Sequence, residues 1–158
     1  MTALTLPGLE VGTWQLRTSS DPAARALADR HYSRGTKGAP TVGPPGRRLV
    51  LVTPDERAAW ITHYPREDLT LDHLDAFRCS MFRNEGDQLS SELIRAAMDA
   101  TLELWKYRPR DGWVTWVDRS KVSSENPGYC FRCAGWARDR DWRPGPWARH
   151  LYRFRAPL

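Results

Sequence analysis

The sequence predicts one α/β domain of the α+β type, in which helices flank a mixed, mostly antiparallel central sheet. Three observations predict this fold class. The chain has 158 residues, a common length for one domain. Segments with strand periodicity and with helix periodicity alternate along it. Several strand segments follow one another across short turns, which favours antiparallel pairing. No internal repeat or long linker divides the chain, so residues 1–158 are expected to form a single domain.

The chain is predicted to begin with a strand and a helix. Residues 13–18 have the composition of a strand. Ser20 or Asp21 is expected to cap a helix whose first turn contains Pro22, where a missing N–H breaks no hydrogen bond. Apolar residues at helical spacing continue this helix to the His-Tyr-Ser segment at residues 31–33.

A loop and three further strands are predicted next. Residues 34–46 are rich in Gly and Pro and are expected to form a loop. Residues 49–53 are a continuous apolar strand, and residues 58–64 return beside it as the second half of a hairpin. Residues 68–75 are a short helix or a turn, and residues 76–82 alternate as another strand.

The strongest helical pattern in the chain follows a polar loop at residues 83–88. A helix is expected to begin at Ser90 or Ser91 and to continue to Tyr107. Its apolar residues recur at helical spacing and form one buried stripe.

Three elements complete the predicted order. Residues 113–117 are a strand that ends in Asp118, residues 129–137 are a short helix, and residues 150–155 are a final strand. This arrangement is similar to the fold of the GNAT acyltransferases.

Positive charge is concentrated in the last third of the chain. Residues 106–158 contain 12 Lys or Arg and five Asp or Glu, a net charge of +7, whereas residues 1–105 contain 12 basic and 14 acidic residues, a net charge of −2. A basic segment attracts nucleic acid or a phosphorylated cofactor, although a solvated surface has the same composition. Arg and Trp also alternate in residues 138–150, which suits phosphate contact and base stacking. The candidate nucleic-acid-binding residues are Lys37, Arg47, Arg138, Arg140, Trp142 and Arg143.

The composition also limits the class of protein. The N-terminus lacks the basic and apolar regions of a signal peptide, and no apolar run approaches the ~18 residues that span a membrane. Three Cys do not suggest a secreted disulfide framework. A cytoplasmic protein that makes no membrane contact is therefore expected. Eight Trp indicate either a core built on indoles or a surface that stacks on a ligand.

The segment at residues 82–94 corresponds to the cofactor loop of the GNAT acyltransferases, in which N–H groups at a helix start bind a pyrophosphate. The family pattern, Arg/Gln-x-x-Gly-x-Gly/Ala, is matched at Arg83 and Gly86. It is not matched at the third position, where Gln88 or, in another alignment, Ser90 stands, and two acidic residues in the loop would repel phosphate. The resemblance implies acetyl-coenzyme A or another acyl or aminoacyl donor, held by Arg78, Arg83, Asn84, Ser90 and Ser91.

A second segment, residues 126–136, resembles the late GNAT helix. In ordinary family members a Tyr four residues before a Gly protonates the departing thiolate. Phe131 occupies that position ahead of Gly135, and Tyr129 is the nearest Tyr in the sequence. The general acid has therefore moved, or the chemistry differs.

Three stretches together resemble the phage Mom family of GNAT-like DNA-modification proteins. They lie at residues 31–33, 82–91 and 117–136, and the resemblance spans residues 25–137. It implies a transferase that modifies a nucleobase in DNA, with the adenine exocyclic amine as the expected acceptor. DNA and a small-molecule donor are the implied partners, and a homodimer stays open.

The resemblance also implies a site at the mouth where the sheet splays. His31 could act as a base because its unperturbed pKa is close to neutral. A Tyr there could donate a proton, and an Asp could accept a hydrogen bond from the amine. The implied catalytic residues are His31, Tyr32, Asp118 and Tyr129.

Other interpretations of these residues stay open. His31 could be a cation at a helix C-terminus, Asp118 a turn cap, and Tyr129 a packed helix residue. His31, Tyr32 and Asp118 could instead bind a transition metal such as iron, since mixed nitrogen and oxygen ligands suit it. Cys130 and Cys133 are expected to pack in the core, because Cys79 would be only a third ligand for zinc.

Two further functions remain as alternatives. One is an acetyl-coenzyme A-dependent N-acetyltransferase that acts on a small-molecule or protein amine, and the other is a non-catalytic nucleic-acid-binding module. The altered cofactor loop and Phe131 count against the first. His31, Tyr32, Asp118 and Tyr129 count against the second.

Overall fold

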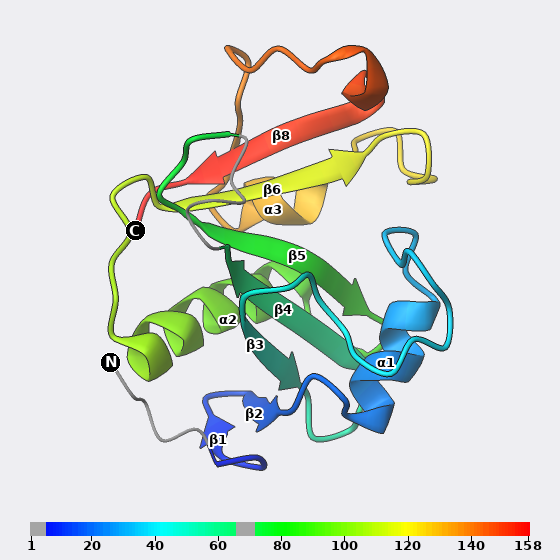
Figure 1. Cartoon of the computed structure of the whole chain (residues 1–158), viewed down its shortest axis with the longest axis vertical. Coiled ribbons are helices and arrows are strands. Elements are labelled where there is room, and N and C mark those ends of the chain that lie inside the picture. The colour runs from blue at the N-terminus through cyan, green and yellow to red at the C-terminus, as the bar shows by residue number, and fades with distance from the viewer. Residues whose placement is uncertain (1–5, 66–71) are drawn as a thin grey trace.

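A computed structural model describes residues 6–65 and 72–158 and has an α+β fold. Its open sheet has eight strands in the order β1-β2-β3-β4-β5-β6-β8-β7 (Figure 1). All neighbouring strands are antiparallel except β5 and β6, which are parallel. The predicted fold class is confirmed. The elements are β1 (Glu10–Val11), β2 (Trp14–Arg17), α1 (Pro22–Asp29), β3 (Arg47–Val52), β4 (Ala58–Tyr64), β5 (Phe77–Asn84), α2 (Ser90–Trp105), β6 (Trp113–Asp118), α3 (Tyr129–Cys133), β7 (Ala137–Arg138), the 3-10 helix η2 (Pro146–Ala148) and β8 (Leu151–Ala156).

The longer predicted elements are present, with ends displaced by four residues or fewer. The largest displacement is in α3, which was expected to reach residue 137 and ends at Cys133. Gly135 adopts a φ of +96°, which is incompatible with a continuing helix. The two-residue strands β1 and β7 and the helix η2 were not predicted, because segments this short show no periodicity. Residues 68–71 of the predicted short helix or turn lie outside the described residues, and residues 72–75 contain neither helix nor strand.

Asp21, rather than Ser20, caps α1. Its carboxylate accepts a hydrogen bond from the backbone N–H of Ala24 at 3.0 Å, which satisfies one of the unpaired donors of the first turn. The helix ends at Asp29, so His31 lies beyond it and not within its last turn as the sequence predicted. The chain then enters a segment, residues 34–46, that contains no helix or strand, as expected.

Side chains of the sheet alternate between two cores, one on each face. In β3, Leu49 and Leu51 belong to the larger core, which is completed by α2 and α3. Val50 and Val52 belong to the smaller core, which is completed by α1. Because successive residues of a strand point to opposite faces, the continuous apolar run in β3 indicates burial on both sides.

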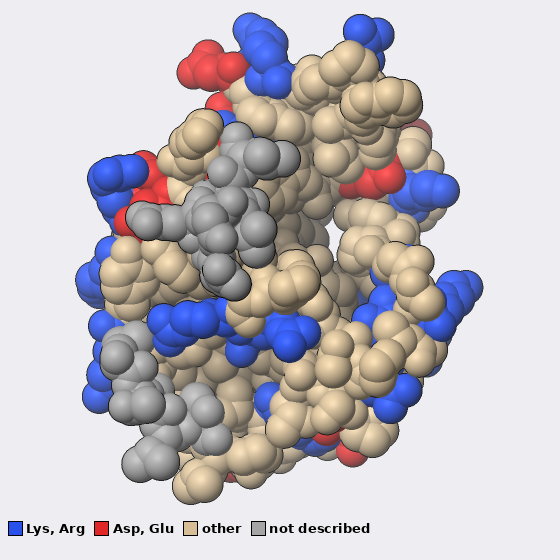
Figure 2. Space-filling view, viewed as in Figure 1, with Lys and Arg blue, Asp and Glu red and all other residues tan. Residues whose placement is uncertain are grey.

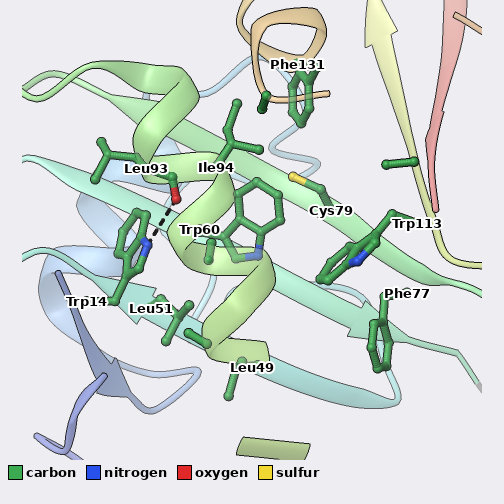
Figure 3. Close-up of a cluster of buried hydrophobic side chains, with 14 of the residues drawn as sticks. Trp14, Leu49, Leu51, Trp60, Phe77, Cys79, Leu93, Ile94, Trp113 and Phe131 are labelled. Carbon is green, nitrogen blue, oxygen red and sulfur yellow. Dashed lines mark hydrogen bonds between the residues drawn. The ribbon is translucent and has the colours of Figure 1, made fainter. Parts of the chain in front are cut away.

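The larger core is built on indole rings (Figure 3). Trp14 donates its ring N–H to the carbonyl of Leu93 in α2 at 3.1 Å, which fixes β2 against that helix. Trp60 and Trp113 are fully buried, with ring centroids 6.1 Å apart. Five of the eight Trp are therefore core residues, and they are Trp14, Trp60, Trp105, Trp113 and Trp136.

The parallel strands β5 and β6 pair over a short distance and then separate. Their register contains two residue pairs, Phe77 with Trp113 and Arg78 with Val114. Beyond these pairs β5 continues beside β4 and β6 continues beside β8, so the ribbons diverge (Figure 1). The Thr115 hydroxyl donates to the carbonyl of Cys79 at 2.8 Å and bridges the strands where the ladder ends. The sheet is open beyond this bridge.

Among the described residues, no helix combines the length and the apolar character that a membrane crossing requires.

Candidate functional site

A cavity of about 180 Å³ occupies the opening between β5 and β6. Its walls come from both strands, from the segment that follows α1 and from the start of α3. The surface is hollowed between the part that carries β6 and β8 and the part that carries α1 (Figure 2). The lining residues are His31, Tyr32, Ser33, Cys79, Ser80, Met81, Phe82, Thr115, Trp116, Val117, Val122, Gly128, Cys130 and Phe131.

Flat rings and a few hydroxyl groups dominate these walls. Five lining residues carry a ring, and Ser33, Ser80 and Thr115 contribute hydroxyls. The volume is below the roughly 300 Å³ typical of pockets for drug-sized ligands. The cavity therefore has room for one ring system rather than for a whole cofactor. Stacking surfaces with a few hydrogen-bonding groups suit a flat heteroaromatic ligand. The ring-bearing residues are His31, Tyr32, Phe82, Trp116 and Phe131.

His31 is a neutral base whose lone pair faces Ser33. The backbone N–H of Ser33 donates to His31 Nδ1 at 3.1 Å, so in the neutral ring the proton lies on Nε2. The Ser33 hydroxyl, 2.7 Å from Nδ1, therefore also donates to that nitrogen. Burial, followed by the nearby positive charge of Arg83, lowers the pKa of His31 to about 4. His31 and Ser33 therefore line the cavity as a hydrogen-bonded pair, and Ser33 was not among the predicted site residues.

Tyr32 lies at the mouth of the cavity beside His31 and the end of β6. Its ring stacks on that of His31 with centroids 4.4 Å apart. Its hydroxyl accepts a hydrogen bond from the backbone N–H of Asp118 at 3.4 Å. Burial raises the pKa of Tyr32, so the phenol keeps its proton at neutral pH. The structure therefore brings His31 and Tyr32 together with the backbone of Asp118.

The carboxylate of Asp118 is engaged by residues that follow β6 and precede β8. It accepts hydrogen bonds from the Ser120 N–H at 2.9 Å and hydroxyl at 2.6 Å, and His150 Nε2 lies 3.8 Å away. Burial opposes ionisation, but the hydrogen bonds from Ser120 outweigh it and the pKa of Asp118 is lowered. Asp118 does not line the cavity and has the geometry of a turn cap, the alternative noted from the sequence.

Tyr129 is not brought to the predicted catalytic group. Its side chain is 59% exposed, and it does not line the cavity although its neighbours Gly128 and Cys130 do. A hydrogen bond with Cys133 raises the pKa of Tyr129. Tyr129 is the first residue of α3 and its side chain is exposed, whereas Phe131, two residues later, is buried.

The acidic residues of the predicted cofactor loop form ion pairs with the arginines in and around it. Glu85 forms ion pairs with Arg83 and with Arg30, the latter at 2.8 Å. Hydrogen bonds from Arg30 and Arg83 lower the pKa of Glu85 to about 2, so Glu85 stays charged and neutralises them. Arg57 lies 3.4 Å from the carboxylate of Asp87 in the same way. The arginines at this loop are therefore engaged.

The remaining predicted cofactor residues do not converge on one anion. The Asn84 side chain donates to Gln88 and to the Ser90 hydroxyl at 3.0 Å, and Ser91 is buried. Arg78 lies near the opposite end of β5, buried and paired with Asp72 at 2.6 Å. These residues do not fit the pyrophosphate of coenzyme A.

The predicted iron ligands do not converge either. Nδ1 of His31 is occupied by Ser33, and the Asp118 carboxylate is occupied by Ser120. Within residues 6–65 and 72–158, no three His, Cys, Asp or Glu side chains come together as a metal site. These three residues therefore do not fit an iron ion.

The predicted nucleic-acid-binding residues fall into two groups. Lys37 lies in the loop after α1, and Arg47 is exposed at the start of β3, with its guanidinium 4.8 Å from the Trp105 ring. The other group lines a separate cavity beside β8 and consists of Arg138, Arg140, Trp142 and Arg143.

Comparison of the chain with protein-family models, with curated proteins and with solved structures finds no match.

Proposed function

We propose that this protein is a transferase that modifies a nucleobase of DNA, with the base bound in the cavity between β5 and β6. The observation that carries the proposal is the His31–Ser33 pair in a cavity walled by aromatic rings. Removal of a proton from the amino group of a nucleobase requires a surface on which the nucleobase stacks and, beside it, an unprotonated side chain that accepts the proton. The resemblance of residues 25–137 to the Mom family supports the same acceptor.

The cavity supports a flipped base rather than a base within a duplex. It lies between two strands of the sheet, and its floor includes the buried residues Cys79 and Phe131. A paired base cannot enter such a recess, because its faces are covered by its neighbours in the stack. An enzyme that acts here would take the base out of the helix or use single-stranded DNA.

In the proposed reaction the exocyclic amine attacks the carbonyl carbon of an activated acyl donor. A nitrogen–carbon bond forms, and the bond to the leaving group breaks with its electron pair. The amine proton passes to the Ser33 oxygen as the hydroxyl proton moves to His31 Nδ1, 2.7 Å away. His31 then returns a proton to the leaving group. Tyr32, protonated at neutral pH, donates a hydrogen bond at the cavity mouth.

Analysis of nucleosides by mass spectrometry tests this function. DNA from cells that express the chain should contain a new nucleoside of higher mass, and His31→Ala and Ser33→Ala should abolish it. Tyr129→Phe is the matched control and should leave the yield unchanged, because Tyr129 lies outside the cavity.

Unmodified DNA in the presence of folded protein would contradict the proposal. Thermal stabilisation by acetyl-coenzyme A would then favour an ordinary N-acetyltransferase. DNA binding that Ser33→Ala leaves unchanged, with no new nucleoside, would favour a non-catalytic binding module.

A further inference from the structure

A second cavity, of about 280 Å³, lies beside β8 at the end of β6 that also borders Tyr32. Six of its 11 lining residues are arginines, and we name it the arginine pocket. The segment between β7 and η2 is at the top of the molecule in Figure 1, and in the same view Figure 2 shows Lys and Arg atoms there, with Asp or Glu atoms beside them. The six arginines are Arg119, Arg138, Arg140, Arg143, Arg149 and Arg153.

Most of the positive charge in this pocket is uncompensated. Asp139, the one acidic residue of the lining, pairs with Arg153 at 2.6 Å and lies 3.9 Å from Arg155. None of the other five arginines lies within ion-pair distance of a carboxylate among the described residues. This contrasts with the surroundings of the loop after β5, where Glu85 and Asp87 each pair with a neighbouring arginine. Concentrated unpaired positive charge in a concave surface attracts a polyanion.

Several of these guanidinium groups are held in place. Arg119 donates to the Tyr152 hydroxyl and to the carbonyl of Arg149, each at 3.2 Å. Arg138 lies over the Tyr152 ring, 3.5 Å from its centroid, and Arg143 donates to the carbonyl of Arg140 at 2.6 Å. Fixed planar guanidinium groups bind phosphate oxygens in pairs and lose little side-chain entropy on binding.

An exposed indole stands next to the pocket. Trp147, in η2, is 93% exposed, whereas the five Trp of the core are buried. It lies in the chain between Pro144 and Arg149, which both line the pocket. An exposed indole beside phosphate-binding arginines is the arrangement by which proteins hold unpaired nucleotides, with a base stacked on the ring.

We propose that the arginine pocket and Trp147 bind single-stranded DNA, with backbone phosphates in the pocket and a base stacked on Trp147. A single strand is favoured over a duplex because stacking on Trp147 requires an exposed base face. Arg119 directly follows Asp118, whose N–H contacts Tyr32 at the mouth of the first cavity. A strand held by the pocket thus lies beside that mouth. The binding of the strand does not depend on the proposed function. Only the chemical modification of the bound strand rests on that function.

Fluorescence anisotropy with an oligothymidylate, and with a duplex of equal length, tests the pocket over a range of salt concentrations. The single strand should bind more tightly. Each phosphate contact to a single strand contributes about 0.7 to the slope of log K against log salt. Arg140→Ala with Arg149→Ala should therefore lower the slope by about 1.4. Neither side chain donates a hydrogen bond within the described residues, so the fold should be unaffected.

The matched control is Lys106→Ala with Arg108→Ala, which removes two exposed cations outside the pocket and should leave the slope unchanged. Like the tested pair, these two side chains donate no hydrogen bond within the described residues. Trp147→Ala should weaken binding about 10-fold without altering the slope, since a stacked base contributes no ion release. Tighter binding of the duplex, or equal slopes for the two double variants, would overturn the proposal.

The two proposals fail separately. His31→Ala should bind the oligonucleotide as the unaltered chain does. If the unaltered chain binds the oligonucleotide but the DNA of cells that express it contains no new nucleoside, the pocket stands and the proposed function fails. If the chain forms a new nucleoside but Arg140→Ala with Arg149→Ala binds the oligonucleotide with an unchanged salt slope, the function stands and the pocket fails.

Discussion

The two ends of the β5–β6 pair differ in how their side chains are used. At the paired end Phe77 and Trp113 are fully buried, with ring centroids 5.0 Å apart. At the open end the strands no longer share a ladder, and Trp116 is half-buried along a cavity. The same two strands thus contribute core packing at one end and a binding surface at the other. The comparison teaches that the ligand site begins where the parallel pairing stops.

Two Trp residues of β6, three positions apart, should show this difference most strongly. Trp113→Ala should lower the free energy of unfolding by about 3–5 kcal/mol, because it leaves a large void among buried rings. Trp116→Ala should cost about 1 kcal/mol or less and should impair binding instead. Urea denaturation of both variants measures the contrast. Equal losses of stability would show that the two ends are packed alike.

The pH dependence of stability should report on His31 at the open end. Its pKa is about 4 in the folded chain and ordinarily 6.5, so protons bind the unfolded chain preferentially between these values. Stability is therefore full above pH 6.5 and falls as the pH decreases toward 4. Between pH 7 and pH 5 we expect a loss of about 2 kcal/mol.

Urea midpoints at the two pH values measure this loss, and His31→Gln should remove it. His63 is the internal reference, because burial lowers its pKa as well and its contribution should persist in the variant. An unchanged pH dependence in His31→Gln would show that His31 is protonated normally.

The smallest expected loss of stability concerns the hydrogen bond between Thr115 and Cys79, which lies between the paired and the open end of β5 and β6. Thr115→Val keeps the side-chain shape and removes the hydroxyl that donates to the Cys79 carbonyl. The loss should be about 1 kcal/mol, since the carbonyl is left without this donor. Hydrogen exchange should also become faster in β6 near residue 115 than near residue 113. Uniform protection along β6 in the variant would contradict a role for the bridge.

The elements of the fold could be predicted because they depend on local periodicity. The hairpin of β3 and β4, the Pro22 start of α1 and the long helix α2 all follow from residue spacing. The divergence of β5 and β6 could not be predicted, because it depends on where pairing between strands distant in the sequence ends. The family resemblance alone implied a splayed sheet.

The candidate site was predictable in part for a related reason. His31 and Tyr32 line the cavity as expected, but the roles of Arg83 and Asp118 depend on their partners. Glu85 forms an ion pair with Arg83, and Ser120 donates hydrogen bonds to the Asp118 carboxylate. Ser33 carried a usable signal, since a hydroxyl two residues after a His can reach its ring nitrogen. The arginine pocket was only partly predicted, because two of its arginines lie outside residues 138–150. Arg119 follows β6 and Arg153 lies in β8, and the pairing of these two strands brings them to the pocket.

Photo-crosslinking tests most directly whether the open end of β5–β6 holds the base. A single-stranded oligonucleotide with a photoreactive adenine analogue would be irradiated with the protein, and the crosslinked peptides would be identified by mass spectrometry. We predict crosslinks in residues 31–33, 79–82 and 115–117, and their loss when unlabelled oligonucleotide competes. Crosslinks confined to β1–β4 or to the arginine pocket would contradict a base-binding cavity between β5 and β6.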